Sequence, residues 1–81
     1  MLRRYTYICP RNVVVAGQRT SVRLEPEMWD ALQEISSARR ITVNELVGEI
    51  ARECQPAPLT ASIRVFLLSY FRRAALLERT P

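Results

Sequence analysis

Histidine and lysine are both absent from this chain of 81 residues, and aspartate occurs only once, at Asp30. The lack of histidine excludes histidine-based catalytic triads, imidazole metal sites and imidazole pH switches. Only two glycines are present, which leaves no glycine-rich loop for binding phosphates. The two cysteines, Cys9 and Cys54, lie far apart and form no metal-ligand cluster. We therefore predict no enzyme, no catalytic residue, no cofactor and no metal, because no nucleophile–base pair can be assembled from these residues.

Long apolar runs are missing as well. Arg3 and Arg4 imitate the start of a secretion signal, but the polar residues 10–12 interrupt any apolar core that could follow. Apolar runs such as residues 65–68 fall far short of the roughly 20 residues that a membrane-spanning helix needs. We therefore predict a cytoplasmic protein with no membrane partner, whose cysteines act as small hydrophobic residues and not as a disulfide.

The basic residues are all arginine, and they outnumber the acidic residues by 12 to 8, which gives a formal net charge of +4. Arginine can bind a phosphate or a guanine edge through two parallel hydrogen bonds, whereas lysine acts as a point charge. A small basic domain favours nucleic acid or an acidic surface as its partner. A GC-rich coding bias also favours arginine over lysine, so composition alone leaves both interpretations open.

The alternation of residues 19–24 predicts a strand with one apolar and one charged face. Thr20, Val22 and Leu24 form the apolar face, and Arg19, Ser21 and Arg23 form the charged face. A lone strand leaves its edge groups unpaired and needs a partner. We expect that partner to be the same strand of a second copy, paired antiparallel. An intrachain hairpin with residues 12–16, turned at Gly17 and Gln18, is the alternative.

Three helices are predicted after this strand. The first begins at Pro26, since proline is tolerated in a first helical turn, and runs to about Arg39. The second begins behind a capping box of Thr42 and Glu45 and ends before the prolines that follow it. The third is capped by Thr60 and covers residues 61–78; it is apolar over most of its girth and should be buried on several sides.

Two strings in the chain, TSVRLEPEMWDAL and LTASIRVFLL, resemble the ribbon-helix-helix family of bacterial DNA-binding repressors, and within it a subgroup with an additional C-terminal helix. The resemblance covers about residues 11–71. It implies a mostly α-helical homodimer with a short β-ribbon, an intermolecular antiparallel two-stranded sheet. Residues 1–17 would be an N-terminal arm with a possible short strand, and residues 18–81 the ribbon-helix-helix domain with its third helix. In one departure, Arg40 stands where many relatives have a helix-ending glycine.

The resemblance also implies a DNA-binding mode. The ribbon would enter the major groove with Arg19, Ser21 and Arg23 against base edges. The backbone amides of Thr42, Val43 and Asn44, which open the second helix, would hold a phosphate. The dimer core would take apolar side chains from the strand and from all three helices, namely Val22, Leu24, Trp29, Leu32, Leu46, Ile50, Phe66 and Tyr70.

The predicted function is therefore sequence-specific binding of double-stranded DNA by a homodimeric transcriptional repressor. Further association of dimers on DNA stays open. One alternative is an antitoxin that binds both DNA and a toxin, although the apolar third helix differs from the flexible, charged tail usual in such antitoxins. Another is a dimeric scaffold that has lost DNA binding, against which Arg19 and Arg23 on the outer face argue.

Overall fold

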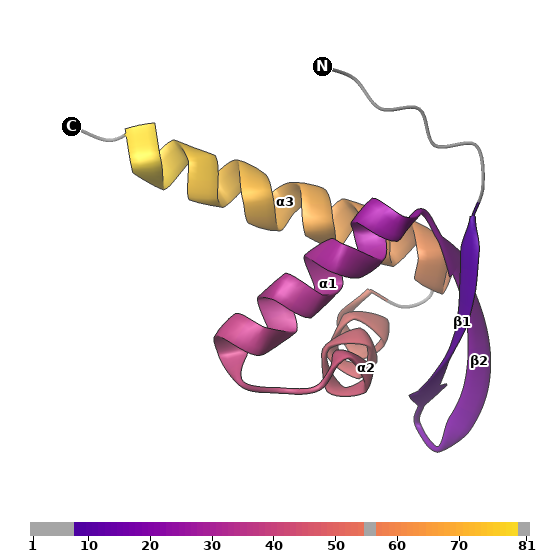
Figure 1. The fold of residues 1–81 in the computed structure, drawn as a ribbon. Coiled ribbons are helices and arrows are strands. Elements are labelled where there is room, and N and C mark those ends of the chain that lie inside the picture. Colours follow the sequence, from indigo (N-terminus) through magenta and orange to yellow (C-terminus); the bar gives the residue numbers. More distant parts are fainter. Residues whose placement is uncertain (1–7, 55–56, 80–81) are drawn as a thin grey trace.

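The computed structural model describes residues 8–54 and 57–79. Its elements are the strands β1 (Cys9–Val15) and β2 (Gln18–Leu24), followed by the helices α1 (Pro26–Arg39), α2 (Val43–Glu53) and α3 (Leu59–Arg79). The two strands form a curved hairpin beside α1 and α2, and α3 passes across them and projects beyond (Figure 1). The expected fold class, mostly α-helical with a short β-ribbon and a third helix, is confirmed.

Residues 19–24 pair with a strand of their own chain. β1 and β2 are antiparallel, with Cys9 opposite Leu24 and Val15 opposite Gln18. Ala16 and Gly17 connect them with φ angles of 54° and 77°, and two positive φ angles are the mark of a type I′ turn. The alternative of an intrachain hairpin is thus confirmed, whereas pairing of the other edge of β2 with a second copy stays a prediction. The hairpin forms because a two-residue turn brings β1 alongside β2 at a low cost in chain entropy.

The ends of α1 follow local rules. Pro26 occupies the first turn after Glu25, as predicted, and Arg39 is the last helical residue. Arg40 takes the left-handed conformation, with φ 60° and ψ 42°. The N–H of Arg40 donates to the carbonyl of Ser37 at 3.1 Å, and the N–H of Ile41 donates to the carbonyl of Ser36 at 2.9 Å. This is the Schellman arrangement usually built on glycine, so the arginine completes the turn at some conformational cost.

The predicted capping box of α2 is confirmed. The Thr42 hydroxyl accepts from the N–H of Glu45 at 3.0 Å, and the Glu45 carboxylate accepts from the N–H of Thr42 at 2.8 Å. The predicted cap of α3 is wrong by two residues. The helix begins at Leu59, directly after Pro58, whose carbonyl accepts from the N–H of Ser62 at 3.0 Å. Thr60 therefore lies inside the first turn and does not cap it.

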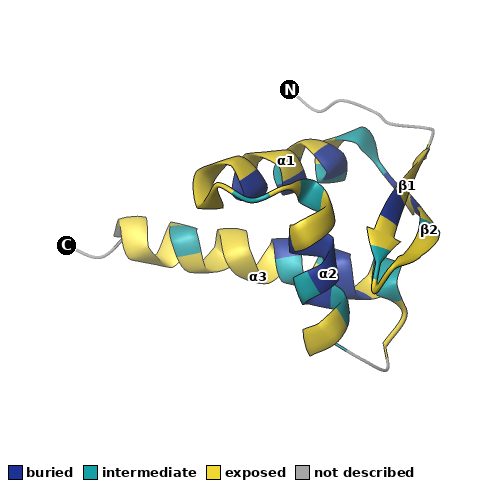
Figure 2. Cartoon of the chain, turned by 90° about the horizontal axis from the view of Figure 1, so that it is seen from below, coloured by how far each residue is buried: buried dark blue, intermediate teal, exposed yellow. Residues whose placement is uncertain are grey.

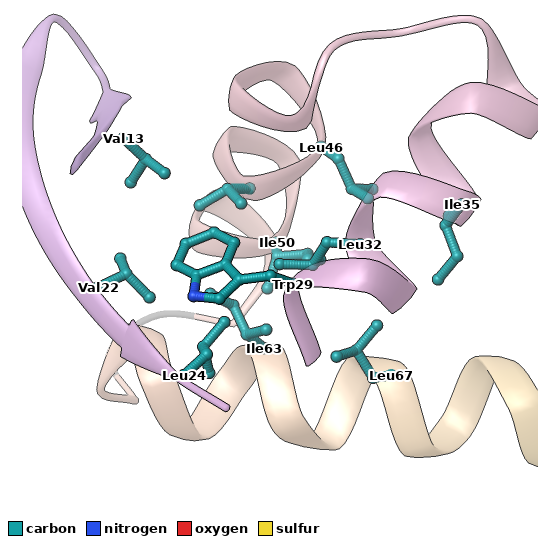
Figure 3. Packing of buried hydrophobic residues seen from close by; sticks show 11 residues of the cluster. Val13, Val22, Leu24, Trp29, Leu32, Ile35, Leu46, Ile50, Ile63 and Leu67 are labelled. Atoms are coloured by element: carbon teal, nitrogen blue, oxygen red, sulfur yellow. The ribbon is translucent and has the colours of Figure 1, made fainter. Parts of the chain in front are cut away.

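The core lies between the inner side of the hairpin and the three helices. Val13 and Val22 project from the hairpin towards the ring of Trp29 (Figure 3). The indole N–H of Trp29 donates to the carbonyl of Cys9 at 2.8 Å, so its one polar group is satisfied inside the chain. The buried apolar residues are Val13, Val22, Leu24, Trp29, Leu32, Ile35, Leu46, Val47, Ile50, Ile63 and Leu67.

Six of the eight side chains predicted for a dimer core lie in this intrachain core. They are each at most 4% exposed in the single chain, and they are Val22, Leu24, Trp29, Leu32, Leu46 and Ile50. Their burial therefore requires no second copy. Phe66 is half-buried and Tyr70 is 37% exposed, so these two still have surface for a partner.

Only the first half of α3 is buried on its inner side, which differs from the expected burial on several sides. Ile63 and Leu67 are covered by the rest of the chain, whereas Tyr70, Phe71 and Leu77 are exposed. Figure 2 shows this change along α3. Within the described part of the chain, no helix is both long and apolar enough to cross a membrane.

Candidate nucleic-acid interface

The side chains that point away from Val22 and Leu24 form a second side of the hairpin, which we call its outer face. Residues directly opposite each other in an antiparallel pair point to the same side of the sheet. The outer face therefore combines the three β2 side chains predicted to contact bases with three side chains of β1, and all six are exposed. The cross-strand pairs are Arg19 with Val14, Ser21 with Asn12, and Arg23 with Pro10.

The outer face is cationic. Residues 9–24 contain three arginines and no acidic residue. Arg19 and Arg23 form no ion pair with any acidic residue that the structure describes. Their guanidinium groups are thus available to an external anion or base edge.

Glu25 is the first acidic residue after the hairpin, at the junction of β2 and α1. Arg64 of α3 forms a salt bridge with it, at 2.9 Å between Nη2 and Oε1. The backbone N–H of Glu25 itself and the guanidinium of Arg64 hold the pKa of this carboxyl below its ordinary value of 4.5. Glu25 is therefore ionised at neutral pH, and Arg64 offsets its charge beside the cationic hairpin.

A two-stranded ribbon of this kind has the dimensions to enter the major groove of B-DNA. Arginine can bind O6 and N7 of guanine bidentately, and serine can contact several bases. The charge pattern of the outer face suits both a phosphate backbone and guanine edges, whereas a neutral or basic partner would leave Arg19 and Arg23 uncompensated.

The start of α2 is the second predicted contact region. The first N–H groups of a helix have no intrahelical acceptor, and the helix dipole places partial positive charge there. The Glu45 side chain already occupies the N–H of Thr42. Of the three amides predicted to hold a phosphate, those of Val43 and Asn44 are therefore the two that the capping box leaves open.

One hollow joins the start of α2 to β1. It is lined by Arg11 and Asn12 from β1, by the capping residue Thr42 and by Val43 and Asn44 of α2, with neighbouring side chains of α1. The guanidinium carbon of Arg11 lies 5.2 Å from the centre of the Trp29 ring, which is within cation–π distance. The two regions predicted to bind DNA are thus adjacent.

The contribution of β1 to both regions is what sequence reasoning missed. Asn12 and Val14 share the outer face, and Asn44 contacts β1 through its side chain as well as lying in the first turn of α2. The apolar run of residues 13–15 gives no alternation, so it hides which side chains point outwards. The available signal was the pairing register that a two-residue turn imposes.

The described residues form no candidate metal site. Within residues 8–54 and 57–79, no three histidine, cysteine, aspartate or glutamate side chains gather where they could hold a metal ion. Cys9 and Cys54 are both half-buried free thiols.

Comparisons with known proteins agree with this geometry. The sequence model of a family described as "Ribbon-helix-helix domain" matches residues 8–71, well over half of the chain. The solved structure of an uncharacterized protein from Bordetella pertussis Tohama I is similar, with a TM-score of 0.73 and 29% sequence identity. The similarity covers 95% of this chain and 64% of the Bordetella chain, so this chain spans less than two thirds of the length of that protein. A search of curated proteins finds no match.

Proposed function

Because this chain belongs to the ribbon-helix-helix domain family, we propose that it is a sequence-specific DNA-binding protein that acts in the cytoplasm as a homodimeric transcriptional repressor. The observation that carries the proposal is the outer face of the hairpin. Arg19, Ser21 and Arg23 are exposed there on a ribbon of groove-compatible width, with no acidic side chain among them. The protein acts by binding and needs no catalytic group.

Phosphate contacts position the ribbon on the duplex. The open amides of Val43 and Asn44 at the start of α2 donate to a backbone phosphate, and the dipole of α2 favours the negative charge. Such contacts hold the hairpin in register on any sequence, while the outer face distinguishes bases.

The far half of α3 supports a homodimer. The apolar stripe that begins with the buried Ile63 and Leu67 continues at helical spacing through Tyr70, Ala74 and Leu77. Ala74 is half-buried, whereas Tyr70 and Leu77 are exposed. A second copy placed against this stripe removes its apolar surface from water. A dimer also inserts one β-ribbon that carries two copies of Arg19, Ser21 and Arg23 into the major groove of the operator.

The same stripe is the observation that favours an antitoxin as the second candidate, because a toxin could cover it in place of a second copy. The two candidates differ in the state of the isolated protein. The homodimer covers the stripe without any other protein, whereas an antitoxin without its toxin leaves Leu77 exposed.

Selection from a random pool of DNA duplexes at physiological salt tests the function. The expected result is enrichment of a short inverted or tandem repeat, because the two copies of the chain in a dimer contact equivalent half-sites. Affinity should fall with salt, at a log–log slope of about −4 to −8, if each copy neutralises a few phosphates. A pool without enriched sequence and a slope near zero would contradict the proposal and favour a scaffold.

A further inference from the structure

The far half of α3 forms a hollow with the end of α2, which we call the α2–α3 hollow. Its lining includes four apolar side chains of α3 and two side chains of opposite charge. The apolar residues are Phe66, Tyr70, Ala74 and Leu77, and the charged residues are Glu53 of α2 and Arg73 of α3. The hollow therefore contains the exposed end of the apolar stripe together with one acidic and one basic group.

Aromatic side chains are concentrated beside this hollow. The ring centres of Phe66 and Tyr70 lie 6.1 Å apart, and the rings of Tyr70 and Phe71 meet edge to face at 5.2 Å. Tyr70 and Phe71 are nevertheless exposed. Aromatic residues are enriched in the buried cores of protein interfaces, because each removes a large apolar area from water. The far half of α3 thus has the composition of a protein-binding surface.

The two charges of the hollow are not compensated by any residue that the structure describes. The salt bridges of the described residues involve other side chains than Glu53 and Arg73. Both of these side chains are exposed, so water solvates them in the single chain. Whatever covers the hollow has to provide a group of opposite sign for each of them, because a charge removed from water without a partner is costly.

A second copy of the chain provides both groups at once. In a contact with twofold symmetry, two different residues that meet across the interface meet twice, once in each direction. Glu53 placed against Arg73 of the second copy therefore forms two equivalent ion pairs. A partner with a purely acidic or purely basic surface would compensate one of the two charges and repel the other.

The spacing of residues along α3 is compatible with such a contact. If two α3 helices cross antiparallel, Tyr70 of each copy lies against Leu77 of the other, and Ala74 lies near the symmetry axis. The small side chain of Ala74 permits the helices to approach closely at the crossing. The antiparallel orientation also brings opposite ends of the two helix dipoles together.

We propose that two copies of the chain dock through their α2–α3 hollows, with antiparallel α3 helices and reciprocal ion pairs between Glu53 and Arg73. The inference rests on the proposed homodimer and assigns it a self-contact apart from the strands. This contact covers Phe66 and Tyr70, the two predicted dimer-core residues that the single chain leaves with open surface.

Charge reversal tests the contact through the dissociation constant of the dimer, measured by sedimentation equilibrium. Glu53→Arg and Arg73→Glu each place like charges at both pairs, so each should raise this constant about 10- to 100-fold. The double variant, with both substitutions in one chain, restores opposite charges and should dimerise nearly as tightly as wild type. Arg72→Glu is the matched control, because Arg72 is exposed on the side of α3 opposite the stripe and should change the constant little.

A mixture of the two single variants separates a contact between copies from a contact within one chain. The Glu53→Arg chain and the Arg73→Glu chain carry complementary charges at both pairs. They should therefore associate with each other about 10-fold or more tightly than either does with itself. An ion pair within one chain would leave the mixture as weakly associated as its components. Circular dichroism should match wild type for every variant, because the substituted side chains are exposed.

Two results overturn the inference and differ in their meaning for the function. If the wild-type chain dimerises and both single variants dimerise as tightly, or the mixture is not rescued, the hollow is not the self-contact and the proposed homodimer stands. If the wild-type chain is a monomer at every concentration, the inference and the proposed homodimer both fail, and the hollow is left to a different protein.

Discussion

The side-chain oxygen Oδ1 of Asn44 accepts a hydrogen bond from the backbone N–H of Val14 at 3.2 Å. This bond joins the first turn of α2 to the outer edge of β1. It therefore couples the helix proposed to hold a phosphate with the hairpin proposed to read bases. Residues 30 positions apart in the sequence are brought together by it, and it also covers part of an otherwise open strand edge.

Replacing Asn44 separates its two roles. Asn44→Ala removes the bond to Val14 but keeps the backbone N–H, and we expect it to lower the free energy of unfolding by about 0.5–1.5 kcal/mol. Asn44→Pro removes the N–H as well, at a position where proline is tolerated. Relative to Asn44→Ala, it should weaken binding to selected and random duplexes by the same factor in a mobility-shift titration. Equal affinities of the two variants would show that this amide holds no phosphate.

Arg23 is expected to read bases. Arg23→Ala should cost about 1–3 kcal/mol on the selected duplex, and much less on random DNA, because a bidentate contact to guanine is lost. The measurement is the ratio of the two dissociation constants at one salt concentration, with circular dichroism as the control for folding. A loss of the same factor on both duplexes would identify Arg23 as a phosphate contact only.

Arg40 strains the turn between α1 and α2. The left-handed conformation costs about 1–2 kcal/mol in a residue with a Cβ atom, and a glycine at this position would avoid that cost. Glycine would in turn lose about 0.5–1 kcal/mol of stability, because its unfolded state is more flexible. Arg40→Gly should therefore raise the free energy of unfolding by about 0.5–1 kcal/mol in a urea titration. Ala38→Gly, two residues earlier and inside α1, should lower it by about 1 kcal/mol. A destabilised Arg40→Gly would mean that the arginine side chain itself stabilises the turn.

Stability should depend on pH through Glu25. A carboxyl whose pKa is lowered by folding stabilises the folded state above its ordinary pKa of 4.5, and this contribution is lost as the pH falls through the lower, folded pKa. The melting temperature of wild type should therefore exceed that of Glu25→Gln at pH 7, and the difference should shrink towards zero in the acid range below pH 4. Glu34→Gln, which changes an exposed carboxyl of α1, is the control. A difference independent of pH would show that Arg64 does not act through charge.

The far half of α3 should control assembly. Leu77→Glu places a charge on the exposed apolar stripe, so we expect it to convert a dimer into a folded monomer of about 9.3 kDa in sedimentation at micromolar concentration. Val65→Glu is the matched control, because Val65 is 63% exposed on the opposite side of the helix and should leave the dimer intact. A monomeric wild-type chain would contradict the proposed dimer.

The local features of the fold could be predicted from the sequence because each depends on a few neighbouring residues. Alternation along residues 19–24 sorted Arg19, Ser21 and Arg23 from the apolar side of β2, and the spacing of Thr42 and Glu45 predicted the start of α2. These are short-range effects of backbone geometry and hydrogen bonding, which act before any tertiary contact forms.

Only the tertiary structure shows that β1 pairs with β2 inside the chain. The sequence was compatible with this hairpin, but the hairpin depends on Ala16 and Gly17 adopting positive φ angles together. Burial was decided in the same way: Leu24 and Ile50 are covered by their own chain, whereas Leu77, on an equally apolar stripe, extends past every element that could cover it. A hydrophobic pattern predicts which side of a helix or strand is removed from water. Which residues cover that side depends on how the elements pack against each other, and this packing forms only in the folded chain.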